Sequence, residues 1–179
     1  ITGLLFWLVF SNYGISAIGF YILAIYTAPL IYMDFKFMRL PNTWVAFCFI
    51  GMIANYAQMF IMKKINVDAI KLGAISFGLT SVFYLSIYIL SRGRGIGFGD
   101  VKLAPVLVAF AAISSWQRGF VAFISGLILA GILAIPLYIF RLVNRKTAIP
   151  LGPFLIVGGW LAILLPTNLV DKFLSLWLL

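Results

Sequence analysis

The sequence predicts an all-α polytopic membrane protein, a bundle of about six transmembrane helices. Hydrophobic residues make up 64% of the 179 residues, only 9% are charged, and the mean hydropathy is +1.15. A soluble domain is nearer half apolar and a quarter charged. Apolar runs of about 20 residues, the length of one bilayer crossing, recur along the chain. We therefore expect one membrane-embedded domain over residues 1–179.

The apolar runs give the expected elements in chain order. Full-length runs cover 14–33, 43–62, 72–90 and 119–140, and shorter runs cover 1–10, 103–116 and 151–165, with an apolar tail after Asp171. Residues 11–14 read as a turn-like break after the first run. Pro29 and Pro136 are candidate helix kinks. The first run is short and starts with Ile, which suggests that an N-terminal part of the protein is missing.

The net charge of +9 is explained by basic residues at the membrane surface. Lys and Arg in loops beside spans meet anionic lipid headgroups, and no basic soluble segment exists to bind nucleic acid. The side that follows the run 14–33 receives eight basic residues: Lys36, Arg39, Arg92, Arg94, Lys102, Arg141, Arg145 and Lys146. The other side receives five: Lys63, Lys64, Lys71, Arg118 and Lys172. The positive-inside rule therefore favours the first side as the cytoplasm.

The composition excludes most catalytic chemistries. The chain has no His, so a Ser–His–Asp triad and His-based metal sites are excluded. The single cysteine, Cys48, forms neither an internal disulfide nor a CxxC metal site. All four acidic residues are aspartates: Asp34, Asp68, Asp100 and Asp171. We expect no metal and no cofactor. If the protein catalyses a polar reaction, we expect some of these aspartates to be its catalytic residues.

Asp34 and Asp100 fall on the same face of the membrane, since the chain crosses twice between them. An aspartate at a membrane boundary costs free energy unless it is paired or hydrated. A structural alternative remains for both: each aspartate only caps a helix end or extends to the headgroup region, since Asp is a good helix N-cap and Asp100 precedes an apolar run. Asp68 and Asp171 fall on the opposite face beside lysines, where we expect solvated loop carboxylates.

Two carboxylates at close range cannot both ionise easily, and such a pair shares one proton. The ionised member takes a proton from water while the protonated member donates to a peptide carbonyl. Glycines alternate with other residues from Gly93 to Gly99, directly before Asp100. Because glycine lets another backbone come close, we expect an extended or flexible segment that admits a scissile peptide. A plain flexible loop between spans is the alternative.

Three segments resemble the motifs of the type IV prepilin peptidases, which are GxGD-type membrane aspartic proteases. Residues 34–42, Asp-Phe-Lys-Phe-Met-Arg-Leu-Pro-Asn, resemble the first aspartate motif. Residues 97–103, Gly-Phe-Gly-Asp-Val-Lys-Leu, resemble the second. Residues 149–155, Ile-Pro-Leu-Gly-Pro-Phe-Leu, followed by Gly158-Gly159-Trp160, resemble the late proline–glycine motif. The three occur in the family's order and cover nearly the whole chain.

The resemblance implies an endopeptidase in the bacterial inner membrane that removes the short basic leader of prepilins or pseudopilins at the cytoplasmic face. Prepilins, pseudopilins and membrane lipids are the expected partners. Asp34 and Asp100 carry over as the catalytic pair. Support positions are Gly97, Gly99, Lys102, Arg39, Pro41, Asn42, Gly152 and Pro153. We expect Pro41 and Asn42 to start the next span, and Lys102 and Arg39 either to reach lipid headgroups or to meet an acidic group of the substrate.

Many bacterial members also N-methylate the new pilin terminus and carry paired CxxC motifs, which this sequence lacks. Methyltransferase activity is therefore not supported by these residues.

Two alternatives to a prepilin peptidase remain open. Other GxGD intramembrane proteases share the glycine–aspartate motif but expect Tyr before the first Asp, where this chain has Met33. A transporter or channel would use Asp34 and Asp100 as ion ligands near mid-bilayer, whereas both fall at span ends.

Overall fold

The computed structural model describes residues 2–13, 18–93, 96–139 and 150–175, and these residues form α-helices without a β-strand. The helices are α1 (Thr2–Tyr13), α2 (Ile18–Phe37), α3 (Asn42–Ile61), α4 (Val67–Leu90), α5 (Phe98–Ala112), α6 (Trp116–Ile139), α7 (Gly152–Leu164) and α8 (Thr167–Ser175). Each apolar run predicted from the sequence corresponds to one helix. The C-terminal tail includes α8, although its last four residues lie outside the described part.

Several boundaries differ from the sequence-based prediction. Helix α2 continues past Met33 to Phe37, so Asp34 lies inside the last turn rather than after the span. Helix α4 begins at Val67, because the Asn66 side chain caps it by accepting a hydrogen bond from the Ala69 N–H at 3.0 Å. The turn-like break expected at residues 11–14 is wrong for residues 11–13, because α1 continues through them and ends at Tyr13. Gly14 lies outside the described residues.

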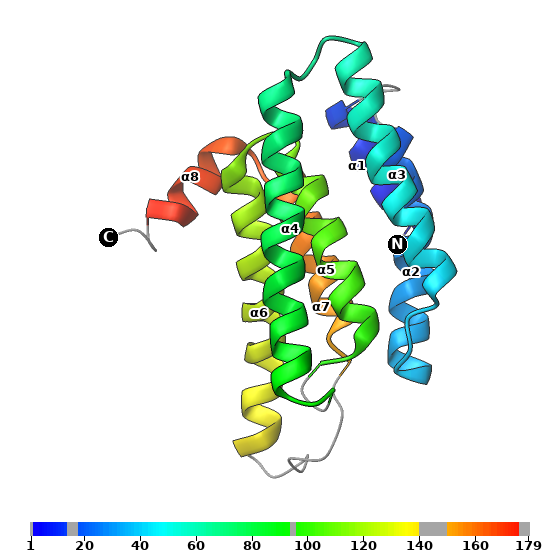
Figure 1. The fold of residues 1–179 in the computed structure, drawn as a ribbon, viewed down its shortest axis with the longest axis vertical. Coiled ribbons are helices and arrows are strands. Elements are labelled where there is room, and N and C mark those ends of the chain that lie inside the picture. The colour runs from blue at the N-terminus through cyan, green and yellow to red at the C-terminus, as the bar shows by residue number, and fades with distance from the viewer. Residues whose placement is uncertain (1, 14–17, 94–95, 140–149, 176–179) are drawn as a thin grey trace.

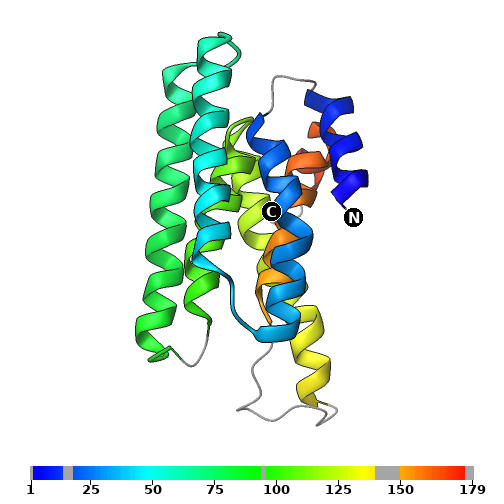
Figure 2. The same ribbon diagram turned by 90° about the vertical axis from the view of Figure 1, so that its right-hand side faces the viewer.

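Helix α5 occupies the centre of the molecule (Figures 1 and 2). It packs against α3, α4, α6 and α7, and every residue from Leu103 to Ala112 is buried. A helix that is apolar on all sides and buried on all sides belongs to the core of a bundle. Although α5 is only 15 residues long, it is enclosed by neighbouring helices and does not have to face lipid along its length.

Helices α6 and α7 approach each other closely at a pair of glycines. A Cβ on Gly158 would lie 2.5 Å from the backbone nitrogen of Gly126, so a side chain at this position would separate the two helices. The Ser125 hydroxyl also donates a hydrogen bond to the Gly158 carbonyl, at 3.1 Å. Small residues and polar contacts of this kind are typical of helix packing in membranes.

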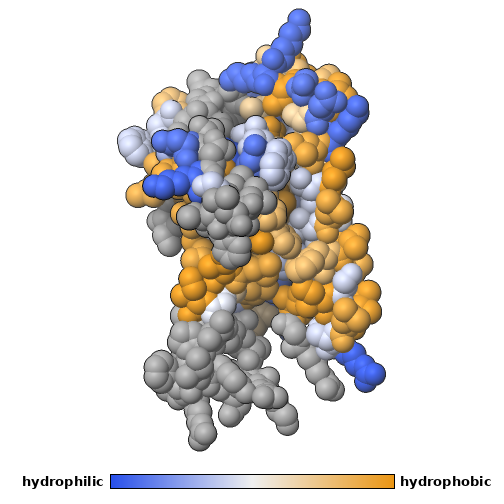
Figure 3. Space-filling view, turned by 90° about the vertical axis from the view of Figure 1, so that its left-hand side faces the viewer, coloured by the Kyte–Doolittle hydropathy of each residue, from blue (hydrophilic) through white to orange (hydrophobic). Residues whose placement is uncertain are grey.

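The outer surface has the character expected of a protein in a bilayer. Helices α2, α3 and α4 are long and apolar enough to span a membrane, and α6 and α7 add shorter apolar stretches. Large exposed apolar side chains cover the outside of these helices, and Figure 3 shows a hydrophobic band with hydrophilic groups toward the two ends. The prediction of an all-α membrane bundle is confirmed.

The two ends of the bundle collect different loops. The C-terminal ends of α2 and α4 lie at the same end as the N-terminal ends of α5 and α7, the lower end in Figure 1. Arg118, which the sequence assigned to a loop at the opposite end, lies instead in the first turn of α6 and is buried. Its guanidinium donates to the carbonyls of Ala162 (3.3 Å) and Ile163 (2.6 Å), in the last turn of α7.

Candidate active site

Asp34 lies on the last turn of α2 and is only 5% exposed. Its Oδ2 accepts a hydrogen bond from the backbone N–H of Gly152 at 2.9 Å. Gly152 is the first residue of α7, so its N–H has no partner inside that helix. The positive end of the α7 dipole therefore faces the Asp34 carboxylate and favours negative charge there.

Asp100 lies in the first turn of α5 and is also 5% exposed. Gly97 is the N-cap of α5, with an extended backbone (φ −70°, ψ 144°), and its carbonyl accepts a hydrogen bond from the Asp100 N–H at 3.1 Å. Within the described part of the chain, Asp100 Oδ1 is buried without a hydrogen-bond partner. The expected extended or flexible segment does not continue up to Asp100: Gly97 is extended, the helix begins at Phe98, and residues 94–95 lie outside the described part.

The two aspartates converge on Gly152. A Cβ built on Gly152 would lie 2.7 Å from Asp34 Oδ2 and 3.4 Å from Asp100 Oδ1. These two oxygens are therefore at most the sum of those distances apart, about 6 Å. That span accommodates one water molecule hydrogen-bonded to both carboxyls. The parity of the spans, which placed both aspartates on one membrane face, is consistent with this geometry.

The GxGD glycines have packing roles in this structure. A Cβ on Gly99 would lie 2.7 Å from the Cβ of Leu40, so glycine lets the start of α5 lie directly against the α2–α3 loop. A Cβ on Gly97 would lie 3.1 Å from Asp100 Oδ2. Both glycines therefore clear space around Asp100 and Leu40.

The first and second aspartate motifs are joined by a hydrogen bond between their polar side chains. Pro41 is the N-cap of α3, and α3 begins at Asn42, so the prediction that this pair starts a span is confirmed. The Asn42 side chain accepts a hydrogen bond from Lys102 Nζ at 2.9 Å, and the same ammonium lies 4.2 Å from the centre of the Phe98 ring. Lys102 thus has partners within the protein, a role that neither sequence-based interpretation included.

A pocket of about 320 Å³ opens at the two carboxyls. It is lined by Asp34, Met38, Arg39, Leu40, Asn42, Gly97, Phe98, Gly99, Asp100, Pro150 and Leu151. Arg39 is exposed at this pocket. Met38 ends the turn after α2 with a left-handed backbone (φ 49°), which is uncommon for a residue other than glycine. Pro153 occupies the first turn of α7, where its missing N–H costs no helical hydrogen bond.

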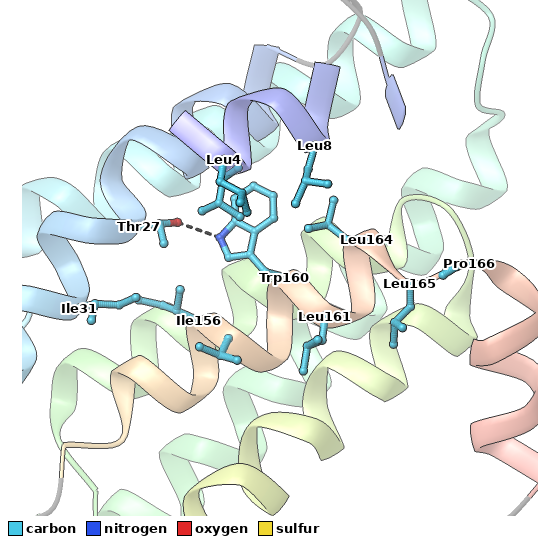
Figure 4. Close-up of a pocket in the computed structure, with 12 residues that line it drawn as sticks. Leu4, Leu8, Thr27, Ile31, Ile156, Trp160, Leu161, Leu164, Leu165 and Pro166 are labelled. Atoms are coloured by element: carbon cyan, nitrogen blue, oxygen red, sulfur yellow. Dashed lines mark hydrogen bonds between the residues drawn. The ribbon is translucent and has the colours of Figure 1, made fainter. Parts of the chain in front are cut away.

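An apolar pocket of about 390 Å³ lies one helical turn further along α2 and α7, beside α1 (Figure 4). Ile31 and Ile156 are among the residues that line its end nearer to the aspartates. Inside it, the Trp160 indole N–H donates to the Thr27 hydroxyl at 2.8 Å. This hydrogen bond is a second tie between the helices that carry Asp34 and Gly152.

Sequence reasoning identified both aspartates but missed how the late motif reaches them. Gly152 was assigned a supporting position, whereas its backbone N–H bonds directly to Asp34. The signal was Pro150 and Pro153 flanking Gly152, a pattern typical of a helix start. No group of three or more His, Cys, Asp or Glu side chains that could hold a metal occurs in the described ranges.

Comparison with known proteins shows which family the chain belongs to. The model of the type IV leader peptidase family matches residues 18–135, which include both aspartates. The prepilin leader peptidase/N-methyltransferase of Pseudomonas aeruginosa is 30% identical over 139 residues, 76% of this chain and 43% of that protein. The Dichelobacter nodosus protein of the same name is 32% identical, over 71% of this chain and 39% of its own length.

The Legionella pneumophila protein of that name is 25% identical over 83% of this chain and 50% of its own length. The chain thus spans about one third to just over one half of the length of the curated relatives that it matches. No solved structure has significant similarity to it. The family model covers well over half of the chain and includes both aspartate motifs, and the chain therefore belongs to the type IV leader peptidase family.

Proposed function

We propose that this chain is a membrane-embedded aspartic endopeptidase that cleaves the leader from prepilins or pseudopilins, with Asp34 and Asp100 as the catalytic pair. The observation that carries the proposal is the convergence of two buried carboxyls on Gly152, within about 6 Å of each other, at one pocket. The relatives named as prepilin leader peptidases supply the substrate class.

The surroundings of the two carboxyls differ, and this difference supports different proposed roles for them. Asp34 accepts the Gly152 N–H at the positive end of α7, an arrangement that favours its ionised form. Asp100 Oδ1 is buried and has no donor among the described residues, an environment that favours a protonated carboxyl. Asp34 is then the general base and Asp100 the general acid.

In the proposed reaction, Asp34 takes a proton from a water molecule whose oxygen adds to the scissile carbonyl carbon. Asp100 gives its proton to the carbonyl oxygen, and a neutral tetrahedral diol forms. In the second step Asp34 returns its proton to the peptide nitrogen and the carbon–nitrogen bond breaks. A diol hydroxyl passes its proton to Asp100 as the new carboxyl group forms, which restores the starting protonation of both aspartates.

By span counting, the side of the membrane that receives Asp34 and Asp100 also receives eight of the thirteen basic residues of the sequence, so we propose that the pocket faces the cytoplasm across the inner membrane. Arg39, exposed at the pocket, is the candidate to meet an acidic group of the substrate, whereas Lys102 is engaged by Asn42. Methyl transfer, which the relatives' names include, is not part of this proposal, because Cys48 is buried within α3 and no other cysteine is present.

The decisive test compares Asp34→Asn and Asp100→Asn with Asp68→Asn in cleavage of a prepilin in liposomes. Asn keeps the shape of the side chain but cannot exchange the catalytic proton, so each pocket variant loses cleavage by several orders of magnitude while remaining folded in the membrane. Asp68, whose side chain is 80% exposed, provides the matched control and retains full activity. Full activity of either pocket variant refutes the mechanism.

A further inference from the structure

Helix α4 buries a tyrosine hydroxyl that has no hydrogen-bond partner. Tyr84 is 1% exposed, and its hydroxyl is unpaired within the part of the chain that the structure describes. An unpaired buried hydroxyl costs free energy that Phe at the same position would not. Tyr56, on α3, is buried in a similar way but donates its hydroxyl to the Ala109 carbonyl at 2.7 Å. The Tyr84 hydroxyl therefore contributes no comparable hydrogen bond to the fold.

Tyr84 lies on the side of α4 that faces the start of α5. One turn later on α4, the Tyr88 ring packs on the Phe98 ring with centroids 5.3 Å apart, and Phe98 is two residues before Asp100. Helices α4 and α5 pack against each other, so Tyr84 and Asp100 lie on neighbouring helices. The Tyr84 ring also makes an edge-on contact with the Phe123 ring on α6, with the centroids 6.1 Å apart.

The unpaired Tyr84 hydroxyl on α4 and the unpaired Asp100 Oδ1 on α5 are both buried, on two helices that pack against each other. No direct hydrogen bond joins them in the structure, so a bridging water or a small movement of either side chain is needed to connect them. A phenol both donates and accepts, so it suits a carboxyl that alternates between protonated and ionised forms.

We propose that Tyr84 is a positioning residue for Asp100, whose hydroxyl donates a hydrogen bond to the Asp100 carboxyl when a substrate occupies the pocket. The inference rests on the proposed aspartic mechanism. The hydrogen bond orients the acid toward the scissile carbonyl and stabilises the carboxylate that forms once Asp100 has given up its proton. Because that charge develops only during the reaction, the contribution appears in kcat rather than in KM.

Two tyrosine-to-phenylalanine variants separate a catalytic role from a structural one. For Tyr84→Phe we expect kcat to fall roughly 10-fold, the effect of one hydrogen bond to a charged group, with KM unchanged. Its melting temperature stays the same or rises, because an unpaired buried hydroxyl has been removed. Tyr56→Phe gives the opposite pattern, with a lower melting temperature and an unchanged kcat, because its hydroxyl bonds to Ala109 far from the carboxyls.

The assay uses the purified full chain in detergent or liposomes with a prepilin substrate. An unchanged kcat for Tyr84→Phe overturns the inference, and so does a kcat loss that is accompanied by an equal loss in Tyr56→Phe. Asp100→Asn, measured in the same experiment, keeps the two proposals apart. If Asp100→Asn is inactive while Tyr84→Phe is fully active, the aspartic mechanism stands and only the role of Tyr84 fails.

Discussion

At Gly152 a backbone amide and two carboxyl groups share a space that no side chain can enter. A Cβ there would lie 2.7 Å from Asp34 Oδ2, so Gly152→Ala must displace either the carboxylate or the start of α7. Displacement of a catalytic group by about 1 Å can cost on the order of 100-fold in rate. We predict a kcat loss of roughly that size for Gly152→Ala, measured by prepilin cleavage with the protein still folded.

Gly78→Ala is the matched control for that substitution. Gly78 lies in α4 with nothing within 4 Å of its Cβ position, so alanine there meets no neighbour and activity stays at the wild-type level. If Gly152→Ala cleaves at the wild-type rate, the close approach of α7 to the carboxyls is not needed for catalysis.

The sequence could predict which residues carry the chemistry better than it could predict their contacts. Asp34 and Asp100 followed from a short list of carboxylates and from counting spans. The bond between Lys102 and Asn42 joins residues 60 positions apart and depends on how α3 packs beside α5. Neither local propensity nor span parity contains that information. The unpaired hydroxyl of Tyr84 is likewise visible only once burial is known.

Among the helices, α7 is fixed at both ends by groups that the sequence did not connect to it. Its first N–H binds Asp34, and its last carbonyls accept from Arg118. Because a buried hydrogen bond to a charged group is worth about 1.5–3 kcal/mol, we predict that Arg118→Met lowers the free energy of unfolding by roughly 2–3 kcal/mol. The measurement is unfolding of the purified protein in detergent.

Lys71→Met is the control, since Lys71 is an exposed cation whose 3.4 Å ion pair with Asp68 contributes at most about 1 kcal/mol. Equal stability of the Arg118 and Lys71 variants would show that the α7 carbonyls do not need the guanidinium. Arg118 was predicted to lie in a loop because hydropathy places any arginine between two apolar runs outside the membrane. Only the packing of α6 against α7 provides carbonyl partners that allow it to be buried.

For the whole molecule, the number and order of helices followed from apolar runs, because a bilayer demands helices of near-constant length. The layout within the bundle did not follow. Helix α5 is central and α8 lies at the periphery, yet both derive from short apolar segments. Hydropathy reports transfer into an apolar medium and does not separate burial in protein from contact with lipid.

The orientation of the whole molecule in the membrane provides the last prediction. Lys63 lies in the loop before α4 and Arg92 directly after it. Both are exposed and have a left-handed backbone (φ 55° and 53°), so cysteine carries the same backbone strain at either position. The substitution Cys48→Ala first removes the buried thiol of the natural sequence. In that background, each of the variants Arg92→Cys and Lys63→Cys carries one thiol. The basic-residue count predicts that a membrane-impermeant thiol reagent labels Lys63→Cys from the outside of intact cells and Arg92→Cys only in inverted vesicles. The reverse pattern would place the aspartate pocket on the outer face and would exclude cleavage of a leader in the cytoplasm.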